Sequence, residues 1–463
     1  MRRIWFFDDE QLPARYNVER RVHRPRKHPA NPLMAPLKPW EGKGVCLEWP
    51  SVLYDEEERL FKAWYEAHRD GKSFGCYATS EDGIHWKRPD LGLIPFRGSR
   101  KNNICYRGVF RTYTAKCVNV MKRGPGDYHM YYWDALRPGG PAGVIHLVSK
   151  DGVRWKYGRV NPVVQTPLDR TRSYGADDVL RVSYDAKGRR FLLSIRTIPF
   201  ENLEKPFLQK KVPSRDGLWQ RRISIATSGD GEHFDALRTV MVPPLNDPFN
   251  VQFYGLSPFR FEDFYLGHLM TFRTGTSYID VELAHSRNGE DWARVLPNFR
   301  YIPNGKPPAF DCGLIHTSPY PIRVGEKLYI YYWGTTSNHS GGTIADAPRL
   351  NALALAVADP RRMVSILAPI RPGSVLVGPF KAGRRLMFDA DAGKGEMKVA
   401  LRDPETYEEI RGFDLNRSDV IKSNSHEHLC TWRGKSDTSK LAGRKVLAHV
   451  HLTKAEIFSL ATA

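Results

Sequence analysis

The sequence predicts an all-β protein, a five-bladed β-propeller followed by a C-terminal β-sandwich. The first observation is a motif, S-E-D-G-I-H-W at Ser80–Trp86, that returns as S-K-D-G-V-R-W, S-G-D-G-E-H-F and S-R-N-G-E-D-W. Each copy follows a short apolar run and contains Asp-Gly or Asn-Gly, the strongest short signal for a β-hairpin. The second is the spacing of the copies, 69, 79 and 58 residues, which indicates a repeat architecture. The third is composition: 71 of 463 residues are Pro or Gly and 12% are aromatic, typical of turn-rich β-proteins.

Three segments follow from this pattern. Residues 1–44 are rich in Pro, Arg and Lys, and we expect an N-terminal arm across the first domain, with the I-W-F-F run docked on it as a strand. Residues 45–370 are expected to form five blades of four antiparallel strands each. Residues 371–463 show alternating strands without the repeat, which favours a separate β-sandwich. Two stacked sandwiches are the alternative for the repeats, but the repeated four-strand order argues against them.

The first two strands of each blade carry the site prediction, so their positions matter. They are expected at Glu48–Tyr54 and Leu60–Glu66, Thr114–Met121 and Asp127–Asp134, Asp177–Tyr184 and Arg190–Arg196, Gln252–Phe259 and Phe264–Arg273, and Phe310–His316 and Lys327–Gly334. In the fifth blade the hairpin has lost its Asp-Gly and reads D-P-R-R.

Charge and hydropathy limit the partners. The formal net charge is +19, but Lys and Arg are dispersed, and their densest cluster, Arg20–Lys27, has no nucleic-acid motif beside it. We therefore expect no nucleic-acid partner; a solvated basic surface explains the charge, and an anionic glycan is the functional alternative. The sequence contains no run of 18 apolar residues, so it predicts no membrane-spanning segment. The first ten residues lack the features of a signal peptide, so we expect either a cytoplasmic protein or a secreted one whose signal has been removed.

Cysteine and histidine usage gives no support for a metal or another cofactor. The six cysteines are scattered without a C-x-x-C pair, and we expect them to be free and mostly buried. His68, His316 and His339 are expected near one face, but their spacing is not that of a metal site. The sequence does not indicate an oligomeric state.

The topology of a β-meander decides where a site can lie. The start of the first strand and the end of the second share one face, while the turn between the third and fourth strands lies at the opposite face. The Asp-Gly hairpins are therefore expected to be structural, with Ser and Asp capping the turn and Trp packing between blades. The functional face carries ten positions: Glu48, Lys116, Asp177 with Asp178, Gln252 and Asp311 at strand starts, and Glu66, Asp134, Arg196, Arg273 and Gly334 at strand ends.

Carboxylates that converge on one concavity suit glycosidic-bond chemistry. One carboxyl protonates the leaving oxygen while the other acts as base or nucleophile, and a third charge can raise the pKa of the acid. The catalytic candidates are Glu48, Asp177, Asp178 and Asp311, although Asp177 and Asp178 point to opposite faces of one strand. The substrate-binding candidates are Glu66, Lys116, Asp134, Arg196, Gln252, Arg273 and His316. A structural role, in ion pairs or in capping the backbone, is the alternative for each carboxylate.

The chain also resembles a known superfamily. Its S-x-D-G-x-x-W hairpins after each third strand are similar to those of five-bladed β-propeller glycoside hydrolases of families 32, 43 and 117. V-G-P-F-K-A-G-R-R-L-M-F-D-A-D and T-W-R-G-K-S-D-T-S-K-L-A-G-R-K-V resemble the C-terminal sandwich of "glycosyl hydrolase family 32-like" proteins. The resemblance implies catalytic carboxylates on the inner strands, with Glu48 in the first blade and Asp177 or Asp178 in a later one. The N-D-P-N-G, R-D-P and E-C motifs of β-fructosidases are absent, and blade two offers Lys116 in place of a carboxylate.

Three functions remain open at the level of sequence. The first is a glycoside hydrolase acting on an oligo- or polysaccharide that carries negative charge. The second is a glycoside phosphorylase, in which Lys116, Arg196 and Arg273 would bind phosphate. The third is a carbohydrate-binding propeller without catalysis, with Trp49, Trp64, Trp133 and Trp333 as stacking surfaces.

Overall fold

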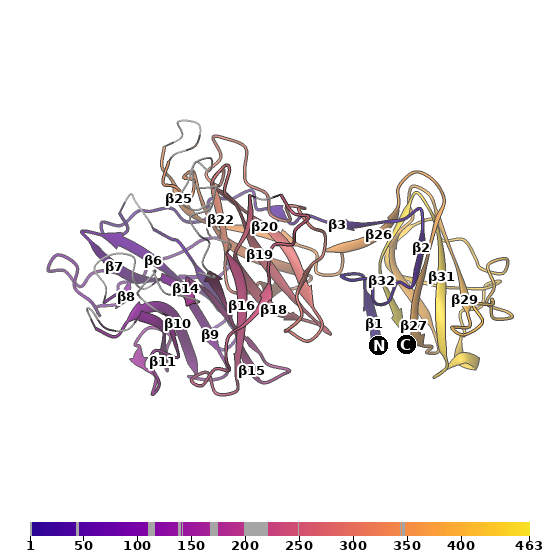
Figure 1. Cartoon of the computed structure of the whole chain (residues 1–463), viewed down its shortest axis with the longest axis horizontal. Coiled ribbons are helices and arrows are strands. Elements are labelled where there is room, and N and C mark those ends of the chain that lie inside the picture. Colours follow the sequence, from indigo (N-terminus) through magenta and orange to yellow (C-terminus); the bar gives the residue numbers. More distant parts are fainter. Residues whose placement is uncertain are drawn as a thin grey trace. The chain divides into compact units, whose positions relative to one another are not determined.

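The computed structural model describes residues 2–42, 46–109, 116–137, 140, 142–166, 175–198, 221–248, 250–342, 344 and 348–463. Strands make up most of the secondary structure in these ranges, so the all-β prediction is confirmed; Ser439–Leu441 form a 3-10 helix. The chain divides into two compact units (Figure 1). We call Arg26–Val357 the repeat unit, and Met1–Pro25 with Ala358–Ala463 the terminal unit. None of the helices described is long and apolar enough to cross a membrane.

Successive groups of antiparallel strands build the repeat unit, and we number them repeats 1 to 5. Repeat 1 contains β5 (Ser51–Asp55), β6 (Leu60–Arg69), β7 (Lys72–Ser80) and β8 (Ile104–Arg107). Repeat 2 contains β9 (Lys116–Lys122), β10 (Tyr128–Ala135), β11 (Ala142–Ser149) and β12 (Lys156–Tyr157), with β13 (Val164–Thr166) also on β11. Repeat 3 contains β14 (Gly175–Asp185), β15 (Arg190–Ile198), β16 (Arg222–Ser228) and β17 (Arg238–Met241). Repeat 4 contains β18 (Val251–Phe261), β19 (Phe264–Arg273), β20 (Tyr278–Ser286) and β21 (Ala293–Arg294).

Repeat 5 takes one strand from the beginning of the chain. Its strands follow the order β22 (Leu314–Thr317), β24 (Lys327–Thr335), β25 (Asn351–Ala358) and β4 (Arg26–Lys27), with β23 (Ile322–Val324) beside β24. A parallel pairing of β22 with β20 joins them to repeat 4 in one sheet. The D-P-R-R segment was expected to form the last hairpin of this repeat. The chain after β25 instead passes into the terminal unit, and β4 pairs antiparallel with β25 in that place. The apolar run of β25 could be located from sequence, but its partner lies more than 300 residues away.

Polar contacts join the first strands of the repeats in a closed order. They are Ser51 with Val120 (2.8 Å), Asn119 with Val182 (3.2 Å), Ser257 with Thr317 (2.9 Å) and Ser318 with Val52 (3.0 Å). The remaining neighbours, β14 and β18, pack directly against each other. Each contact satisfies a buried polar group next to the axis of the repeats, as buried polar groups require. The first strand of repeat 5 therefore contacts the first strand of repeat 1, which closes the order of contacts.

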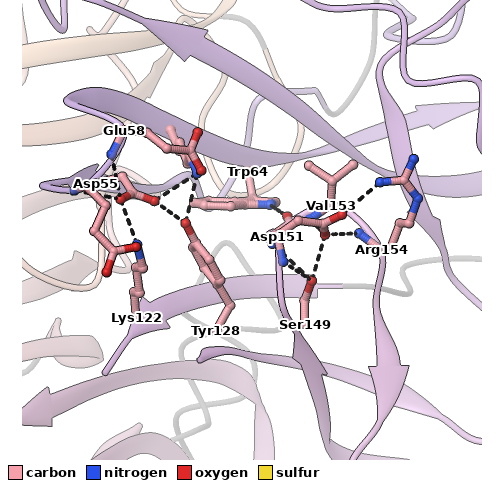
Figure 2. A network of polar contacts seen from close by, with 12 residues as sticks. Asp55, Glu58, Trp64, Lys122, Tyr128, Ser149, Asp151, Val153 and Arg154 are labelled. Atoms are coloured by element: carbon pink, nitrogen blue, oxygen red, sulfur yellow. Dashed lines mark hydrogen bonds and ion pairs between the residues drawn. The ribbon is translucent and has the colours of Figure 1, made fainter. Parts of the chain in front are cut away.

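The Asp-Gly turns lie on the face away from the strand-one starts. Ser149 Oγ donates to Asp151 Oδ1 (3.0 Å), which accepts the N–H groups of Val153 (2.9 Å) and Arg154 (2.7 Å) (Figure 2). Trp64 Nε1 of repeat 1 donates to the carbonyl of Gly152 in this turn at 2.8 Å. Tyr131 does the same to Gly231, and Tyr331 of repeat 5 to Gly83 of repeat 1, each at 2.8 Å. These contacts support the structural role that we predicted for the hairpins.

A second structural network on that face links repeats 1 and 2. Asp55 accepts hydrogen bonds from Lys122 (2.7 Å), Lys62 (2.8 Å) and Tyr128, and Lys62 also reaches Glu58 (2.7 Å) (Figure 2). Asp55 and Lys62 are fully buried, and each has a partner of opposite charge within this network. The six cysteines are buried and free, which confirms the prediction for them.

The terminal unit contains two antiparallel sheets. One has the order β3 (Glu19–Val22), β26 (Val364–Ala368), β32 (Ala455–Thr462), β28 (Leu386–Asp391) and β30 (Asn424–Leu429), with β1 (Arg2–Trp5) on β32. The other has the order β2 (Ala14–Tyr16), β27 (Gly373–Lys381), β31 (Lys445–Thr453) and β29 (Glu396–Arg402). The two ends of the chain lie together, since β1 pairs with β32 (Figure 1).

The predicted N-terminal arm needs a correction here. The predicted arm is divided between the two units: its strands β1, β2 and β3 pair within the terminal unit, whereas the chain from Arg26 belongs to the repeat unit. The terminal unit continues from Ala358 and not from residue 371. Ile4, Trp5, Phe6 and Phe7 are buried there. The physical reason is that an apolar strand can complete any sheet with a free edge, and local sequence does not say which one.

Candidate active site

β-Bulges interrupt the first strands of repeats 1 to 4 close to their starts. In repeat 1, Cys46 bridges Ala67 and Ser51 pairs with Trp64, so residues 47–50 oppose only two residues. Bulges follow Lys116 in β9, Ala176 in β14 and Phe253 in β18. Leu47, Trp49 and Cys117 adopt left-handed backbone conformations, with φ of +61°, +51° and +56°. A bulge re-aims side chains and ends regular pairing, which is common beside active sites.

Glu48 is a carboxyl of this face that is largely buried but still partly exposed. Its side chain is 14% exposed, and Oε1 lies 3.5 Å from Nδ1 of His316. Burial and the neighbouring Glu66 raise the pKa of Glu48 to about 7, although Lys116 opposes the shift. A carboxylic acid that retains its proton near neutral pH can act as a general acid.

Asp178 lies between two cations from different strands. Its Oδ2 accepts a hydrogen bond from Lys116 Nζ at 2.8 Å, and its Oδ1 accepts one from Arg196 Nη2 at 2.7 Å. Burial disfavours the charged ammonium of Lys116, but Asp178 and Glu48 hold its pKa well above the usual value. Three positions predicted from strand starts and ends, Lys116, Asp178 and Arg196, therefore meet in one ion-pair network.

Glu66 is a second buried carboxyl in contact with this group. Its Oε1 accepts the backbone N–H of Cys117 at 2.5 Å, and its Oε2 lies 3.5 Å from Nε2 of His68. Nδ1 of His68 is 3.0 Å from the hydroxyl of Ser73. Burial raises the pKa of Glu66 to about 8 and lowers that of His68. Only 1% of Glu66 is exposed, so solvent and ligands reach Glu48 more readily.

Aromatic rings form layers beside Glu48. The rings of Trp49 and His316 stack with centroids 3.9 Å apart, and Tyr254 follows 5.6 Å from His316. Arg181 lies over Trp49 (4.8 Å) and Arg196 over Tyr254 (4.5 Å). Burial, with Arg181 and other cations nearby, keeps the pKa of His316 well below its usual value, so the ring is neutral.

Sequence reasoning did not find several of these residues. Arg181 is fully buried, and its guanidinium donates to the carbonyls of Thr317 (2.5 Å) and Val118 (3.5 Å); burial lowers its pKa to about 10. Arg221 donates to Gln252 Oε1 at 2.6 Å and lies 5.7 Å from the ring of Tyr254. The signal for Arg181 was present: one arginine within the apolar strand V-L-R-V-S-Y. Tyr254 is the bulged residue of β18, and a regular alternation of faces does not predict its direction.

Other predicted residues have contacts away from this group. Asp311 lies in a turn three residues before β22, and it accepts hydrogen bonds from Lys27 Nζ (2.5 Å) and Tyr332 (2.9 Å). Arg273 pairs with Asp280 (2.7 Å) and Glu282 (3.4 Å) of β20. Asp134 accepts the backbone N–H groups of Val109 (3.0 Å) and Ala135 (2.8 Å). The side chain of Asp177 lies outside the part of the chain that the structure describes.

We compared the chain with known proteins. No protein-family model and no curated protein sequence matches it. A solved structure described as a glycoside hydrolase is similar, with 14% identity over 73% of this chain and 92% of that chain and a TM-score of 0.46. An N-acetylgalactosamine deacetylase from F. plautii in complex with blood group B trisaccharide has 15% identity, 74% and 95% coverage and a TM-score of 0.45.

A third similar structure comes from the GH130 family of mannoside phosphorylases, which contains glycoside hydrolases that target β-1,2-mannosidic linkages in Candida mannan. It has 14% identity, 74% and 95% coverage and a TM-score of 0.46. The solved structures that are similar to the chain also include a thermostable family-43 glycoside hydrolase, with 14% identity, 66% and 88% coverage and a TM-score of 0.44.

Proposed function

We propose that the protein is a glycoside hydrolase, with a five-bladed β-propeller over the repeats and a C-terminal β-sandwich. The observation that carries this proposal is Glu48, a partly exposed carboxyl whose pKa is raised to about 7 beside a second, ion-paired carboxylate, Asp178. In this proposal Glu48 delivers its proton to the glycosidic oxygen as the bond breaks. Asp178 activates the attacking water or stabilises the positive charge that develops on the anomeric carbon.

The charge balance of the site supports a substrate with an anionic group. Lys116, Arg181, Arg196 and Arg221 are cations, whereas the carboxyls are Glu48, Glu66 and Asp178. The pKa values of Glu48 and Glu66, about 7 and about 8, leave Glu48 about half protonated and Glu66 largely protonated at neutral pH. The site is therefore net positive, and a uronate, sulfate or phosphate group on the glycan would balance it. Arginine binds such oxyanions in bidentate geometry.

The same cations favour a second candidate, a glycoside phosphorylase. Inorganic phosphate would take the place of water as the attacking group, and Glu48 would remain the acid. Arg196 and Arg221 both lie near Tyr254, at 4.5 Å and 5.7 Å from its ring, so they could hold one oxyanion between them. A carbohydrate-binding module without catalysis would need neither the raised pKa of Glu48 nor the second carboxylate.

The test is an activity screen of the purified full-length protein. Neutral, uronate-bearing and sulfated oligosaccharides are incubated with and without inorganic phosphate, and products are identified by NMR and mass spectrometry. We expect hydrolysis of an anionic glycan, and a loss of about 10²–10⁴-fold in rate in Glu48→Gln. Asp178→Asn should also lose activity, whereas Glu232→Gln, a matched change at a buried glutamate that accepts the backbone N–H of Arg159, should not.

Phosphate-dependent formation of a sugar phosphate would replace hydrolysis with phosphorolysis. Unchanged rates in both Glu48→Gln and Asp178→Asn would overturn the site assignment. Binding of a glycan that is never cleaved would favour the non-catalytic alternative.

A further inference from the structure

Cys117 uses all of its polar groups in contacts that join three repeats. Its backbone N–H donates to Glu66 Oε1 of repeat 1 at 2.5 Å, and its thiol donates to the backbone carbonyl of Asp178 in repeat 3 at 3.1 Å. Its own carbonyl accepts a hydrogen bond from the side chain of Asn119. The residue is fully buried, so water does not compete for these bonds.

The backbone of Cys117 needs this support. Its φ is +56°, in the left-handed region that residues with a β-carbon rarely adopt without compensating contacts. It is also the first bulged residue of β9, directly after Lys116. A relaxed conformation at Cys117 would therefore turn the preceding Lys116, whose ammonium lies 2.8 Å from the carboxylate of Asp178.

Glu66 is less accessible to a ligand than Glu48. Its side chain is 1% exposed, against 14% for Glu48, and its two oxygens face the Cys117 amide and the ring of His68. Sequence reasoning treated Glu66 as a substrate-binding residue. The contacts fit a different role, because a carboxyl that accepts a buried backbone N–H holds that backbone in place.

We propose that Glu66 and Cys117 are positioning residues that hold the β9 bulge so that Lys116 aims at Asp178. Glu66 supplies the acceptor for the strained amide, and the Cys117 thiol ties the same bulge to the backbone of Asp178. Neither residue touches the substrate. The effect of this arrangement on catalysis rests on the proposed function, whereas the hydrogen bonds themselves do not.

Two readouts test the proposal in the full-length protein. The first is amide hydrogen exchange at Cys117, followed by NMR or by mass spectrometry of the peptide that contains it. Glu66→Ala should accelerate exchange by about tenfold or more, and Glu66→Gln, whose amide oxygen still accepts the bond, should leave it near the wild-type rate. Glu232→Ala is the control: it removes another buried acceptor of a backbone N–H group in the repeat unit, that of Arg159, and should not change exchange at Cys117.

The second readout is the split between kcat and KM on the glycan identified by the screen. Glu66→Ala should lower kcat by about 10- to 100-fold with KM changed less than about threefold, because positioning acts on the transition state. Glu66→Gln should restore most of kcat. Cys117→Ala provides an independent variant: it loses the thiol donor and should lower kcat, while Cys117→Ser keeps a donor and should retain it.

The outcomes separate this inference from the proposed function. If Glu66→Ala leaves exchange at Cys117 unchanged, Glu66 does not hold the β9 bulge, whatever the activity of the protein. Faster exchange with unchanged kcat would overturn the positioning role, and a rise in KM alone would make Glu66 a substrate-binding residue. If the wild-type protein cleaves no glycan, the proposed function fails, but the exchange experiment still decides whether Glu66 holds the β9 bulge. A Glu66→Ala protein that does not fold leaves the decision to Cys117→Ala against Cys117→Ser.

Discussion

Nδ1 of His316 lies 3.5 Å from Oε1 of Glu48, on an imidazole that stacks against Trp49 with centroids 3.9 Å apart. The pKa of His316 is held well below its usual value by burial and by cations including Arg181, so the ring next to Glu48 is neutral at physiological pH. A neutral ring gives the Glu48 carboxylate no opposite charge. Burial of Glu48 is therefore free to keep the proton on its carboxyl.

This relationship predicts the pH dependence of activity. The protonated form of Glu48 is the one that acts as general acid, and its pKa is about 7. We therefore expect kcat/KM to fall as pH rises above about 7, with one titrating group on the alkaline side. Glu48→Gln should abolish this limb together with most of the activity. A profile that stays flat from pH 6 to 9 would contradict the assignment of Glu48 as the acid.

The Lys116–Asp178 pair should show strong thermodynamic coupling. Asp178→Asn leaves Lys116 and Arg196 without their hydrogen-bonded carboxylate in a largely buried place, which should cost about 3 kcal/mol of unfolding free energy. Lys116→Met should cost less, because Asp178 keeps its ion pair with Arg196. The double variant should cost less than the sum, with a coupling energy of about 1–3 kcal/mol in urea denaturation. The exposed pair Lys87–Glu81 is the control, with an expected coupling below about 1 kcal/mol. Equal coupling in both pairs would contradict the proposed network.

Asp311 should matter for stability more than for catalysis. Its carboxylate is 2% exposed and binds Lys27 of β4 and Tyr332 of β24. It therefore links β4, the strand that completes repeat 5, to β24. We expect Asp311→Asn to lower the unfolding free energy by about 2 kcal/mol, Lys27→Met to do the same, and the double variant to add little. Activity measured below the unfolding transition should stay within about threefold of wild type. An Asp311→Asn protein with normal stability but no activity would instead support the catalytic role predicted from the sequence.

The strands of the repeat unit could be located from sequence because their turns have local chemistry. In each hairpin the Ser and Asp or Asn side chains bond to backbone N–H groups of the same motif. The seven residues of S-x-D-G-x-x-W therefore contain the interactions that form the turn. The expected bounds of Leu60–Glu66 and Phe264–Arg273 match β6 and β19 to within three residues. The strands at residues 2–27 pair with partners more than 300 residues away, and nothing local specifies such a partner.

The site was predictable only in part, for a reason of register. Lys116, Asp178 and Arg196 lie near strand starts and ends on one face, and Glu48 lies three residues before β5, so the topology of the strands was enough to select these positions. Each bulge adds residues to the first strand, and one added residue reverses which side chains face the axis. Tyr254 was therefore missed. Asp311 was assigned to a strand start because F-D-C-G-L-I-H reads as a strand, but residues before Leu314 form a turn.

The Asp151 turn gives the last prediction. Burial alone would raise the pKa of Asp151, but the N–H groups of Arg154 and Val153 and its ion pair lower it to about 2. Asp151→Ala removes the acceptor of both N–H groups and should cost about 1 kcal/mol of unfolding free energy, as helix caps with the same geometry do. Asp151→Asn should cost less, because Asn288 caps the equivalent turn of repeat 4 with bonds to Glu290 (2.8 Å) and Asp291 (2.9 Å).

The sign of the pH effect at this turn follows from the lowered pKa. The folded carboxyl binds its proton less tightly than the unfolded one, so its contribution is complete above pH 4 and is lost as pH falls toward 2. Denaturation of wild type and Asp151→Asn at pH 7 and pH 3 measures this, and the difference between the two proteins should shrink at pH 3. Glycan cleavage should be unchanged in both variants, because the turn lies on the face opposite Glu48. Loss of activity in a stable Asp151→Asn protein would mean that the hairpin face takes part in function.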